Sequence, residues 1–254
     1  MRRTSALALA VSAAAGAYGC TDVSGSSGSV LSIQFDSLAT PSVVLGDTLR
    51  DTTGAVVTPV IHAFDFNGGE IVNPTVRFQS PDSGVRVDSI RGFITADSLR
   101  TTQARIYATV GSLQAVQRVD VTLRPDNITA VNPVDSLSFS LVDTTLDISP
   151  QLQITLKHGV APNDSAVKSY IVSYAIVAQK NPKLGELVND AGKPSHVDTT
   201  DAGGVAGRRI RLHPVFLQSA IAIDTIKVDA TTKYRGAQVS GSPVHFVLIL
   251  KPSS

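Results

Sequence analysis

The sequence is poor in residues that favour helices and in residues that carry acid–base chemistry. Its 254 residues include two glutamates, one methionine, one cysteine and no tryptophan. Glutamate and methionine favour helices, whereas the abundant valines (31) and threonines (22) suit a pleated sheet. The nineteen aspartates suit turns, where a carboxylate accepts hydrogen bonds from nearby backbone N–H groups. The scarcity of helix formers therefore excludes a large helical or α/β domain.

The charge balance and the single cysteine exclude further classes of protein. Lys+Arg 22 against Asp+Glu 21 gives a net charge of +1, which provides neither the basic surface that nucleic acid requires nor an acidic tail. We therefore expect no nucleic-acid partner. A chain with one cysteine has no internal disulfide, so each domain depends on its apolar core for stability. The length accommodates one large or two ordinary domains.

The first residues have the organisation of a secretory signal peptide. Two arginines follow the initiator methionine, and an apolar run of twelve residues extends from Ala6 to Ala17. This run is too short to cross a bilayer, which requires about 20 residues, but it has the length and the flanks of a signal. Cys20 follows shortly after it, and the arrangement resembles a bacterial lipoprotein signal, in which the cysteine receives the lipid. The resemblance predicts a signal peptide over residues 1–19 and lipidation of Cys20.

Two alternatives to a lipoprotein signal remain open. Cleavage after Ala17 would release an ordinary secreted protein with Cys20 as a free thiol. The arginine pair also allows an interpretation as a twin-arginine signal, although the bulky apolar residues that should follow the pair are absent. Lipidation accounts for the unpaired cysteine of a secreted chain. Thr21, in place of an aspartate, resembles the signal for sorting to the outer membrane.

Together these features predict where the protein is located. Residues 20–31 are rich in glycine and serine and predict a flexible tether. The predicted membrane contact is the N-terminal lipid anchor. We expect a bacterial cell-envelope protein that is lipid-anchored in the outer membrane and faces either the periplasm or the surface.

From residue 32 onward, apolar and polar residues alternate with a period of two, as in strands with one buried face. The clearest runs lie at residues 106–110, 119–123, 137–141, 152–156 and 226–230. Turn-forming residues separate the runs at short intervals, and no stretch shows a capped apolar stripe of helical period. The pattern predicts an all-β fold of antiparallel β-sandwiches.

A polar segment with prolines near both ends divides the chain. We predict domain 1 at residues 32–124, a linker at 125–133 and domain 2 at 134–251, with a long loop near 178–197. Both domains are close to the roughly 100 residues of an immunoglobulin-like sandwich.

Several motifs of domain 1 resemble those of bacterial immunoglobulin-like domains of the invasin and intimin type. They are the hairpin Asp65-Phe66-Asn67-Gly68, the strand around Phe78 where the family usually has tryptophan, the strand Gly92-Phe93-Ile94-Thr95-Ala96, and the final Val119-Asp120-Val121. Domain 2 resembles the same superfamily less closely, with Tyr174 as its candidate core aromatic residue. The resemblance implies two tandem immunoglobulin-like sandwiches without a catalytic residue.

Candidate metal sites are few. None of the five histidines is paired at a ligand spacing. Asp65-x-Asn67-Gly68 begins like a calcium loop, but Val76 stands where a bidentate glutamate is needed, so we interpret the motif as a turn. A calcium site at the domain junction, with Asp120, Asp126, Asn127 and Asp143 as its ligands, remains open. We otherwise predict no metal and no cofactor.

Acid–base chemistry has little support. Glu70 and Glu186, the two glutamates, lie in predicted loops of different domains, and the nucleophile elbow of acyl transfer is absent. The least favoured alternative is a hydrolase site within residues 157–197, for which the candidates are Asp164, Lys168, Glu186, Asp190 and His196. We predict that the protein is not an enzyme and has no catalytic residue.

Two surface features suggest binding. Arg208, Arg209 and Arg211 form the densest basic stretch and predict either a charged outer face that discourages aggregation or a patch for an anionic ligand. The strand Val244 to Leu250 is apolar on both faces apart from His245, so it is either central in its sandwich or covered by a partner.

These observations favour a non-enzymatic, lipid-anchored envelope protein. Its immunoglobulin-like domains would act as a spacer and a binding module in adhesion or another surface interaction, with a protein or glycan partner that the sequence does not identify. The alternative is a structural subunit of an envelope or secretion assembly that docks its partners through an exposed β-edge.

Overall fold

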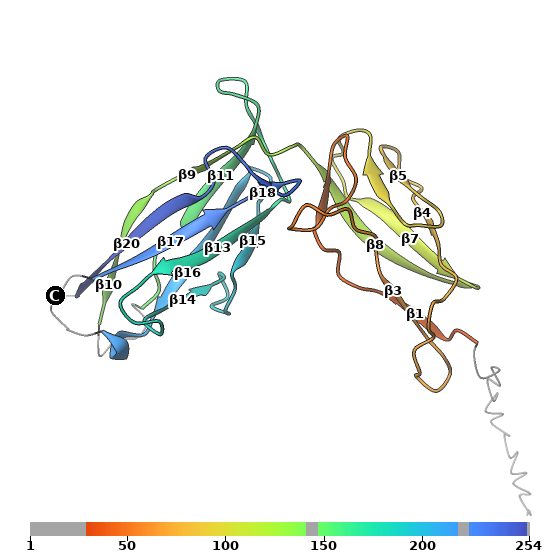
Figure 1. The fold of residues 1–254 in the computed structure, drawn as a ribbon, viewed down its shortest axis with the longest axis horizontal. Coiled ribbons are helices and arrows are strands. Elements are labelled where there is room, and N and C mark those ends of the chain that lie inside the picture. The colour runs from red at the N-terminus through yellow and green to blue at the C-terminus, as the bar shows by residue number, and fades with distance from the viewer. Residues whose placement is uncertain (1–28, 141–146, 218–223, 253–254) are drawn as a thin grey trace, which may run out of the picture.

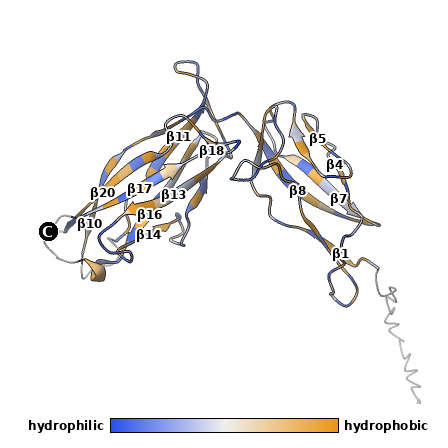
Figure 2. Cartoon of the chain, in the orientation of Figure 1, coloured by the Kyte–Doolittle hydropathy of each residue, from blue (hydrophilic) through white to orange (hydrophobic). Residues whose placement is uncertain are grey.

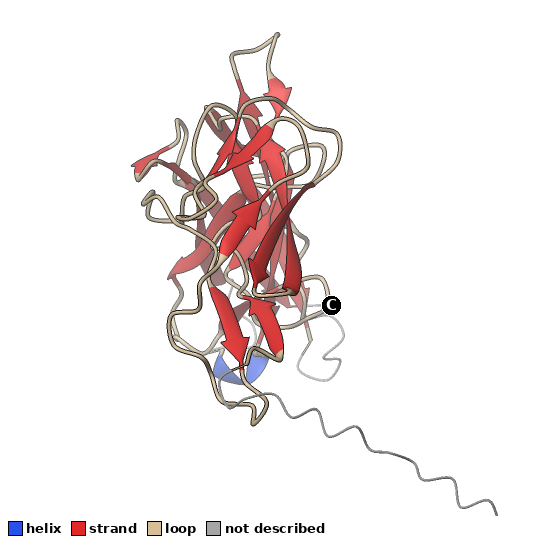
Figure 3. Ribbon diagram, turned by 90° about the vertical axis from the view of Figure 1, so that its right-hand side faces the viewer, coloured by secondary structure: helices blue, strands red, loops and turns tan. Residues whose placement is uncertain are grey.

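The computed structural model describes residues 29–140, 147–217 and 224–252, which form two all-β domains in tandem (Figure 1). Within these ranges the one helical element is a short 3-10 turn at Pro214–Phe216, drawn blue among the red strands of Figure 3. No helix in the described ranges has the length and apolarity needed to cross a membrane. The predicted signal peptide, Cys20 and most of the tether lie outside the described residues.

Domain 1 consists of a four-stranded sheet and two smaller strand pairs. The sheet has the order β2-β8-β7-β4, while β1 pairs with β3 and β5 pairs with β6. The strand bounds are β1 (Ser32–Phe35), β2 (Ser42–Val44), β3 (Ile61–Phe64), β4 (Arg77–Gln79), β5 (Val85–Val87), β6 (Ile94–Ala96), β7 (Ala104–Val110) and β8 (Leu113–Thr122). Ile106, Val119 and Val121 of the sheet pack in one core with Val85 and Ile94 of the β5–β6 pair.

Domain 2 is a sandwich of two larger sheets. One has the order β10-β20-β17-β13-β15, and the other has the order β12-β11-β16-β14, with β9 also paired to β11. The strand bounds are β9 (Asn127–Ala130), β10 (Val134–Phe139), β11 (Leu152–His158), β12 (Ser165–Ala166), β13 (Ile171–Ala178), β14 (Gly185–Val188), β15 (Val197–Thr199), β16 (Val205–Leu212), β17 (Asp224–Thr231), β18 (Lys233–Tyr234), β19 (Ala237–Gln238) and β20 (Val244–Pro252). Strands β18 and β19 form a separate hairpin.

The alternation of apolar and polar residues explains why these segments become strands. In β7 and β17 every second side chain is buried, and Figure 2 shows hydrophobic and hydrophilic residues succeeding one another along the strands. Phe139 and Phe246 lie in the core of domain 2 with Tyr174, the predicted core aromatic residue. Phe78, which stands where the resembled family usually has tryptophan, is 7% exposed. The predicted all-β sandwich fold is confirmed.

The structure also differs from the sequence-based expectations. The predicted linker, residues 125–133, contains β9, which pairs with β11 and buries Ile128. Asparagine and threonine alternate there with apolar residues, as in a strand. The run is short and lies between two prolines, so its sequence resembles that of a polar linker. The predicted long loop near 178–197 likewise contains β14, which pairs with β16 and buries Leu187.

The direction of two strand pairs is a further difference. Strands β2 and β10 run parallel to the last strands of their domains, β8 and β20, so the sandwiches are not antiparallel throughout. Strand β20 lies between β10 and β17. The apolar strand Val244 to Leu250 is therefore central in its sheet, which is the first of its two predicted alternatives.

Candidate functional site

The three arginines predicted as an anion-binding patch do not present their guanidinium groups together. Arg208 is 8% exposed, and its Nη1 lies 2.9 Å from Asp198 Oδ1. Arg209 and Arg211 alternate with buried residues and lie on the opposite face of β16. Arg209 Nε is 3.3 Å from Asp190 Oδ1, and Arg211 Nη2 donates to the Gly192 carbonyl at 2.7 Å. The strand period thus separates Arg208 from the other two, and each of the three has a partner within the protein.

The residues considered for calcium serve other purposes in the structure. Asp65 Oδ1 accepts hydrogen bonds from the backbone N–H groups of Asn67 and Gly69, both at 2.8 Å, which closes a hairpin turn. Asp120 accepts a hydrogen bond from Ser169, and Asp126 pairs with Arg124 and His158. Asp143 lies outside the described residues, and Asn127 is the first residue of β9. Across the described ranges no group of three or more acidic, histidine or cysteine side chains is placed to hold a metal ion.

The residues considered for a hydrolase are not brought together. Asp164 pairs with Lys157, Lys168 with Asp120 and Asp190 with Arg209. Glu186 lies on β14, where it lines a shallow depression of about 620 Å³ with His196 and His213.

Glu70 belongs to an ion pair on the outer face of domain 1. Its Oε1 lies 2.5 Å from His62 Nδ1, and Asp36 Oδ2 lies 3.1 Å from His62 Nε2. The hydrogen bond to Glu70, followed by that to Asp36, raises the pKa of His62. Two carboxylates on one imidazole favour the charged ring. The three side chains are all at least one-third exposed to solvent, so we expect the cluster to add little to stability.

The most elaborate polar arrangement lies at the junction of the two domains. Strand β8 ends at Thr122 and β9 begins at Asn127, so only residues 123–126 connect the domains. Ser42 Oγ donates to the Ser169 carbonyl and Thr122 Oγ1 to the Lys168 carbonyl, both at 2.6 Å. These bonds attach the segment before β13 to the base of domain 1.

A second group of side chains reinforces this attachment. Ser169 Oγ donates to Asp120 Oδ2 at 3.0 Å, and Lys168 Nζ lies 3.7 Å from Asp120 Oδ1. Lys168 Nζ also donates to the Arg100 carbonyl at 3.2 Å. Both the backbone and the side chains of residues 168 and 169 bond to domain 1. The contact therefore restrains both the position and the orientation of domain 2 relative to domain 1.

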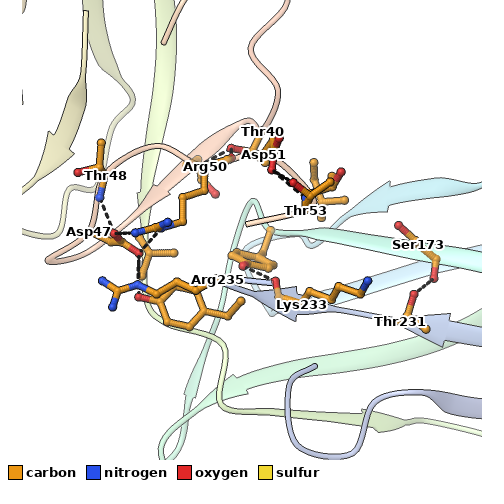
Figure 4. A pocket seen from close by; sticks show the side chains of 16 residues that line it. Thr40, Asp47, Thr48, Arg50, Asp51, Thr53, Ser173, Thr231, Lys233 and Arg235 are labelled. Atoms are coloured by element: carbon orange, nitrogen blue, oxygen red, sulfur yellow. Dashed lines mark hydrogen bonds and ion pairs between the residues drawn. The ribbon is translucent and has the colours of Figure 1, made fainter. Parts of the chain in front are cut away.

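Asp47 is the centre of the other half of the junction. It belongs to domain 1, is 5% exposed, and receives hydrogen bonds from both domains (Figure 4). Arg50 Nε lies 3.0 Å from Asp47 Oδ2 and Arg50 Nη2 lies 3.1 Å from Oδ1. From domain 2, Tyr234 Oη donates to Oδ2 at 3.0 Å and Arg235 Nε at 2.8 Å. We call Asp47, Arg50, Tyr234 and Arg235 the Asp47 cluster.

The electrostatics of this cluster favour the charged carboxylate. Burial alone raises the pKa of Asp47, but the hydrogen bonds from Arg235, Arg50, the Thr48 backbone and Tyr234 outweigh it and hold the pKa well below its ordinary value. Burial, followed by the hydrogen bond to Asp47, raises the pKa of Tyr234. The tyrosine therefore remains a donor and the aspartate remains an acceptor at neutral pH.

A close backbone contact accompanies the Asp47 cluster. Gly54, in the loop after Arg50, lies against the turn between β18 and β19. A Cβ on Gly54 would overlap the backbone nitrogen of Gly236 and lie 2.8 Å from its Cα. The two loops approach so closely because neither residue has a side chain at this point.

The residues of the Asp47 cluster also line a cleft of about 440 Å³ between the two domains. Its walls come from the segment between Thr40 and Thr53 in domain 1 and from β13, β17 and β18 in domain 2. Tyr170 lines the cleft, and its hydroxyl donates to the Lys233 carbonyl at 2.8 Å. Burial raises the pKa of Tyr170, so this hydroxyl also stays protonated. We take this interdomain cleft as the candidate site.

Sequence reasoning did not identify this site. Asp47 and Arg235 are separated by 188 positions, and each lies in a segment that reads as an ordinary turn. The one feature of the sequence that marks the site is a glycine next to a charged residue. Each domain contributes one such pair to the junction, at Gly46-Asp47 and at Arg235-Gly236.

The depressed pKa of Asp47 leads to an expected pH dependence. An aspartate in the unfolded chain has a pKa of about 3.9, so the stabilisation by the Asp47 carboxylate is complete above that value and is lost as the pH falls towards the lower folded pKa. We expect the free energy of unfolding, measured by urea titration from pH 6 to pH 2.5, to fall less steeply below pH 4 in Asp47→Asn than in the wild type.

The variant is needed because other carboxylates titrate in the same range. The side-chain hydrogen bond from Arg105, followed by its backbone N–H, lowers the pKa of Asp82 to about 2, and this contribution is common to both proteins. Parallel pH profiles for the wild type and Asp47→Asn would contradict the assigned role of the Asp47 carboxylate.

The comparisons with known proteins add little to this picture. The sequence matches no known protein-family model, and no curated protein is significantly similar to it. Among solved structures, domains 4 and 5 of the S-layer protein SbsC are 14% identical, with 89% of this chain and 99% of that chain covered and a TM-score of 0.30. Human protocadherin-24 EC1-2 is 14% identical, with 89% and 100% covered and a TM-score of 0.28. At these values the likeness carries no argument about function, and the fold assignment depends on the strands themselves.

Proposed function

We propose that this protein is a non-enzymatic, lipid-anchored component of a bacterial cell envelope, in which two immunoglobulin-like sandwiches form a rigid spacer and a binding module. The observation that supports it best is the junction. A four-residue connection, two hydrogen bonds at 2.6 Å and the Asp47 cluster fix one domain on the other. A spacer requires such restraint, because a loosely linked pair would not hold a binding surface at a set distance.

The direction of the chain suits an anchored spacer. Strand β1 lies at the outer end of domain 1, and the described C-terminal end lies at the opposite tip of domain 2 (Figure 1). An anchor at Cys20 would therefore place domain 1 near the membrane and domain 2 far from it. Two or more acyl chains, each contributing about 0.8 kcal/mol per buried CH₂, would make such an anchor effectively permanent.

The anchor is tested by changing its cysteine. In Cys20→Ala we expect the protein to move from the membrane fraction to the soluble fraction, because no lipid can be attached. The measurement is fractionation of cells followed by immunodetection, with metabolic incorporation of a labelled fatty acid as the direct readout.

The matched control is Ser24→Ala, in the adjoining tether, which should remain membrane-bound and labelled. If Cys20→Ala remained in the membrane fraction to the same extent as this control, the proposed anchor would be wrong, and the spacer would need another attachment.

The alternative function, an assembly subunit that docks partners through a β-edge, stays a prediction. The strand first considered for this role, Val244 to Leu250, has hydrogen-bonded neighbours on both sides, so it has no free edge to receive an added strand. Docking would have to use another edge, and crosslinking of intact cells followed by identification of the attached protein would test it.

A further inference from the structure

The interdomain cleft has the dimensions of a ligand site. Its volume of about 440 Å³ falls within the range of about 300–1,000 Å³ that is typical of small-molecule pockets, which often lie between domains. Its occupant would touch Tyr170 and Lys233 of domain 2 and the Thr40–Thr53 segment of domain 1 at once.

The lining is rich in hydroxyl groups that are already used as donors. Nine of the sixteen lining residues carry a hydroxyl. Thr40 Oγ1 donates to backbone carbonyls, Thr53 Oγ1 donates to Asp51, and Tyr170 Oη donates to the Lys233 carbonyl. A hydroxyl whose hydrogen is engaged still offers lone pairs, so the cleft favours a ligand with many O–H donors.

Tyr170 and Lys233 add two further elements of recognition. The half-buried ring of Tyr170 offers an apolar surface beside the hydroxyls, which suits the C–H face of a sugar ring. Lys233 is exposed, and no described carboxylate forms an ion pair with its ammonium group. In Figure 4 its side chain extends towards Ser173 and Thr231, away from Asp47, to which Arg235 turns.

The charges around the cleft favour an anion at Lys233. Asp47 is occupied by Arg50 and Arg235, and Asp51 Oδ1 accepts hydrogen bonds from its own turn, at Thr53 and Ala55. A ligand carboxylate could therefore pair with the ammonium group without displacing an internal partner.

We propose that the interdomain cleft binds an acidic saccharide, with a sugar ring against Tyr170, its hydroxyls on the engaged hydroxyls of the lining, and its carboxylate on Lys233. This inference rests on the proposed function as a binding module and names its ligand class. The sequence suggested an anion-binding patch at Arg208, Arg209 and Arg211, but their guanidinium groups have partners within the protein. The proposal therefore places the anion at Lys233 instead.

The proposal is tested by titration of the purified full chain with trigalacturonate, and with maltotriose as a neutral probe. Binding is measured by calorimetry at low ionic strength and by tyrosine fluorescence, which is unobscured because the chain has no tryptophan. We expect saturable binding of trigalacturonate and binding of maltotriose at least tenfold weaker. Lys233→Gln should lose about tenfold in affinity for trigalacturonate, and Lys233→Arg should retain most of it.

Lys227→Gln is the matched control, because Lys227 is an exposed lysine on β17 that does not line the cleft. This variant should bind like the wild type. The proposal is overturned if trigalacturonate does not bind saturably, if maltotriose binds equally well, or if Lys233→Gln binds unchanged. The membrane fractionation of Cys20→Ala is independent of these titrations, so a failure of the ligand assignment is distinguishable from a failure of the proposed anchor.

Discussion

Replacing Asp47 with alanine is expected to lower the free energy of unfolding by about 2–4 kcal/mol and to uncouple the two domains. The carboxylate is 5% exposed and accepts hydrogen bonds from Thr48, Arg50, Tyr234 and Arg235. Its removal leaves those donors without an acceptor at a junction that is partly shielded from water. Loss of one partner of a buried ion pair costs about 3–5 kcal/mol. The expected value is smaller, because Arg235 is half exposed and regains water.

Two measurements report the two parts of this effect. Urea denaturation gives the loss of stability, and ¹⁵N relaxation shows whether the domains tumble together. In the wild type the domains should share one rotational correlation time, whereas in Asp47→Ala domain 1 and domain 2 should show separate and shorter ones.

The control for Asp47→Ala is an ion pair without a role at the junction. Asp97 pairs with Arg86, whose side chain is 80% exposed, and exposed pairs contribute about 0–1 kcal/mol. Asp97→Ala should therefore change stability little and leave the domains coupled. If Asp47→Ala behaved like Asp97→Ala in both measurements, the Asp47 cluster would not be what holds the junction.

Much of the fold could be predicted because strand periodicity is a local property. In β7 and β17 the alternation of side chains decides which face is buried, so the apolar runs located these strands and their inward residues. Tyr174, which the family resemblance gave as the candidate core aromatic residue of domain 2, lies on the buried face of β13 together with Val172. Strand β9 was missed because four residues between prolines give too short a pattern to distinguish from a polar linker.

The candidate site could not be predicted because it depends on how the two domains meet. Asp47 and Tyr234 are 187 positions apart, and neither segment carries a motif for its partner. Arg208 illustrates the reverse error, in which a charged residue next to other charges suggested an exposed patch. Strand alternation instead places Arg208 on the buried face, where Asp198 neutralises it.

Replacing Gly54 with alanine should separate the domains without unfolding either of them. The added Cβ would overlap the Gly236 backbone nitrogen, and backbone atoms, unlike the end of a flexible side chain, cannot move aside cheaply. Gly54 also has a φ of +94°, which costs a residue with a side chain about 1 kcal/mol. Overpacking adds typically about 1–3 kcal/mol if the domains stay docked. In ¹⁵N relaxation we expect two rotational correlation times, as for Asp47→Ala.

Gly68→Ala isolates the contact from the backbone strain. Gly68 has a φ of +77° in another turn of domain 1, and a Cβ there would meet no atom within 4 Å. It should therefore lose about 1 kcal/mol of stability and keep the domains coupled. If Gly54→Ala matched Gly68→Ala in both stability and domain coupling, the loops that carry Gly54 and Gly236 would not be in contact in solution.

The double variant Asp47→Ala/Gly54→Ala tests whether both residues act on one docked state. Undocking relieves the overlap at Gly54, so the overlap cannot cost more than the free energy of docking. Once Asp47→Ala has released the domains, the second substitution should cost only the backbone strain of about 1 kcal/mol. Strict additivity of the two losses would mean that the Asp47 cluster and the Gly54–Gly236 contact stabilise separate parts of the molecule, and the junction would then not be a single rigid unit.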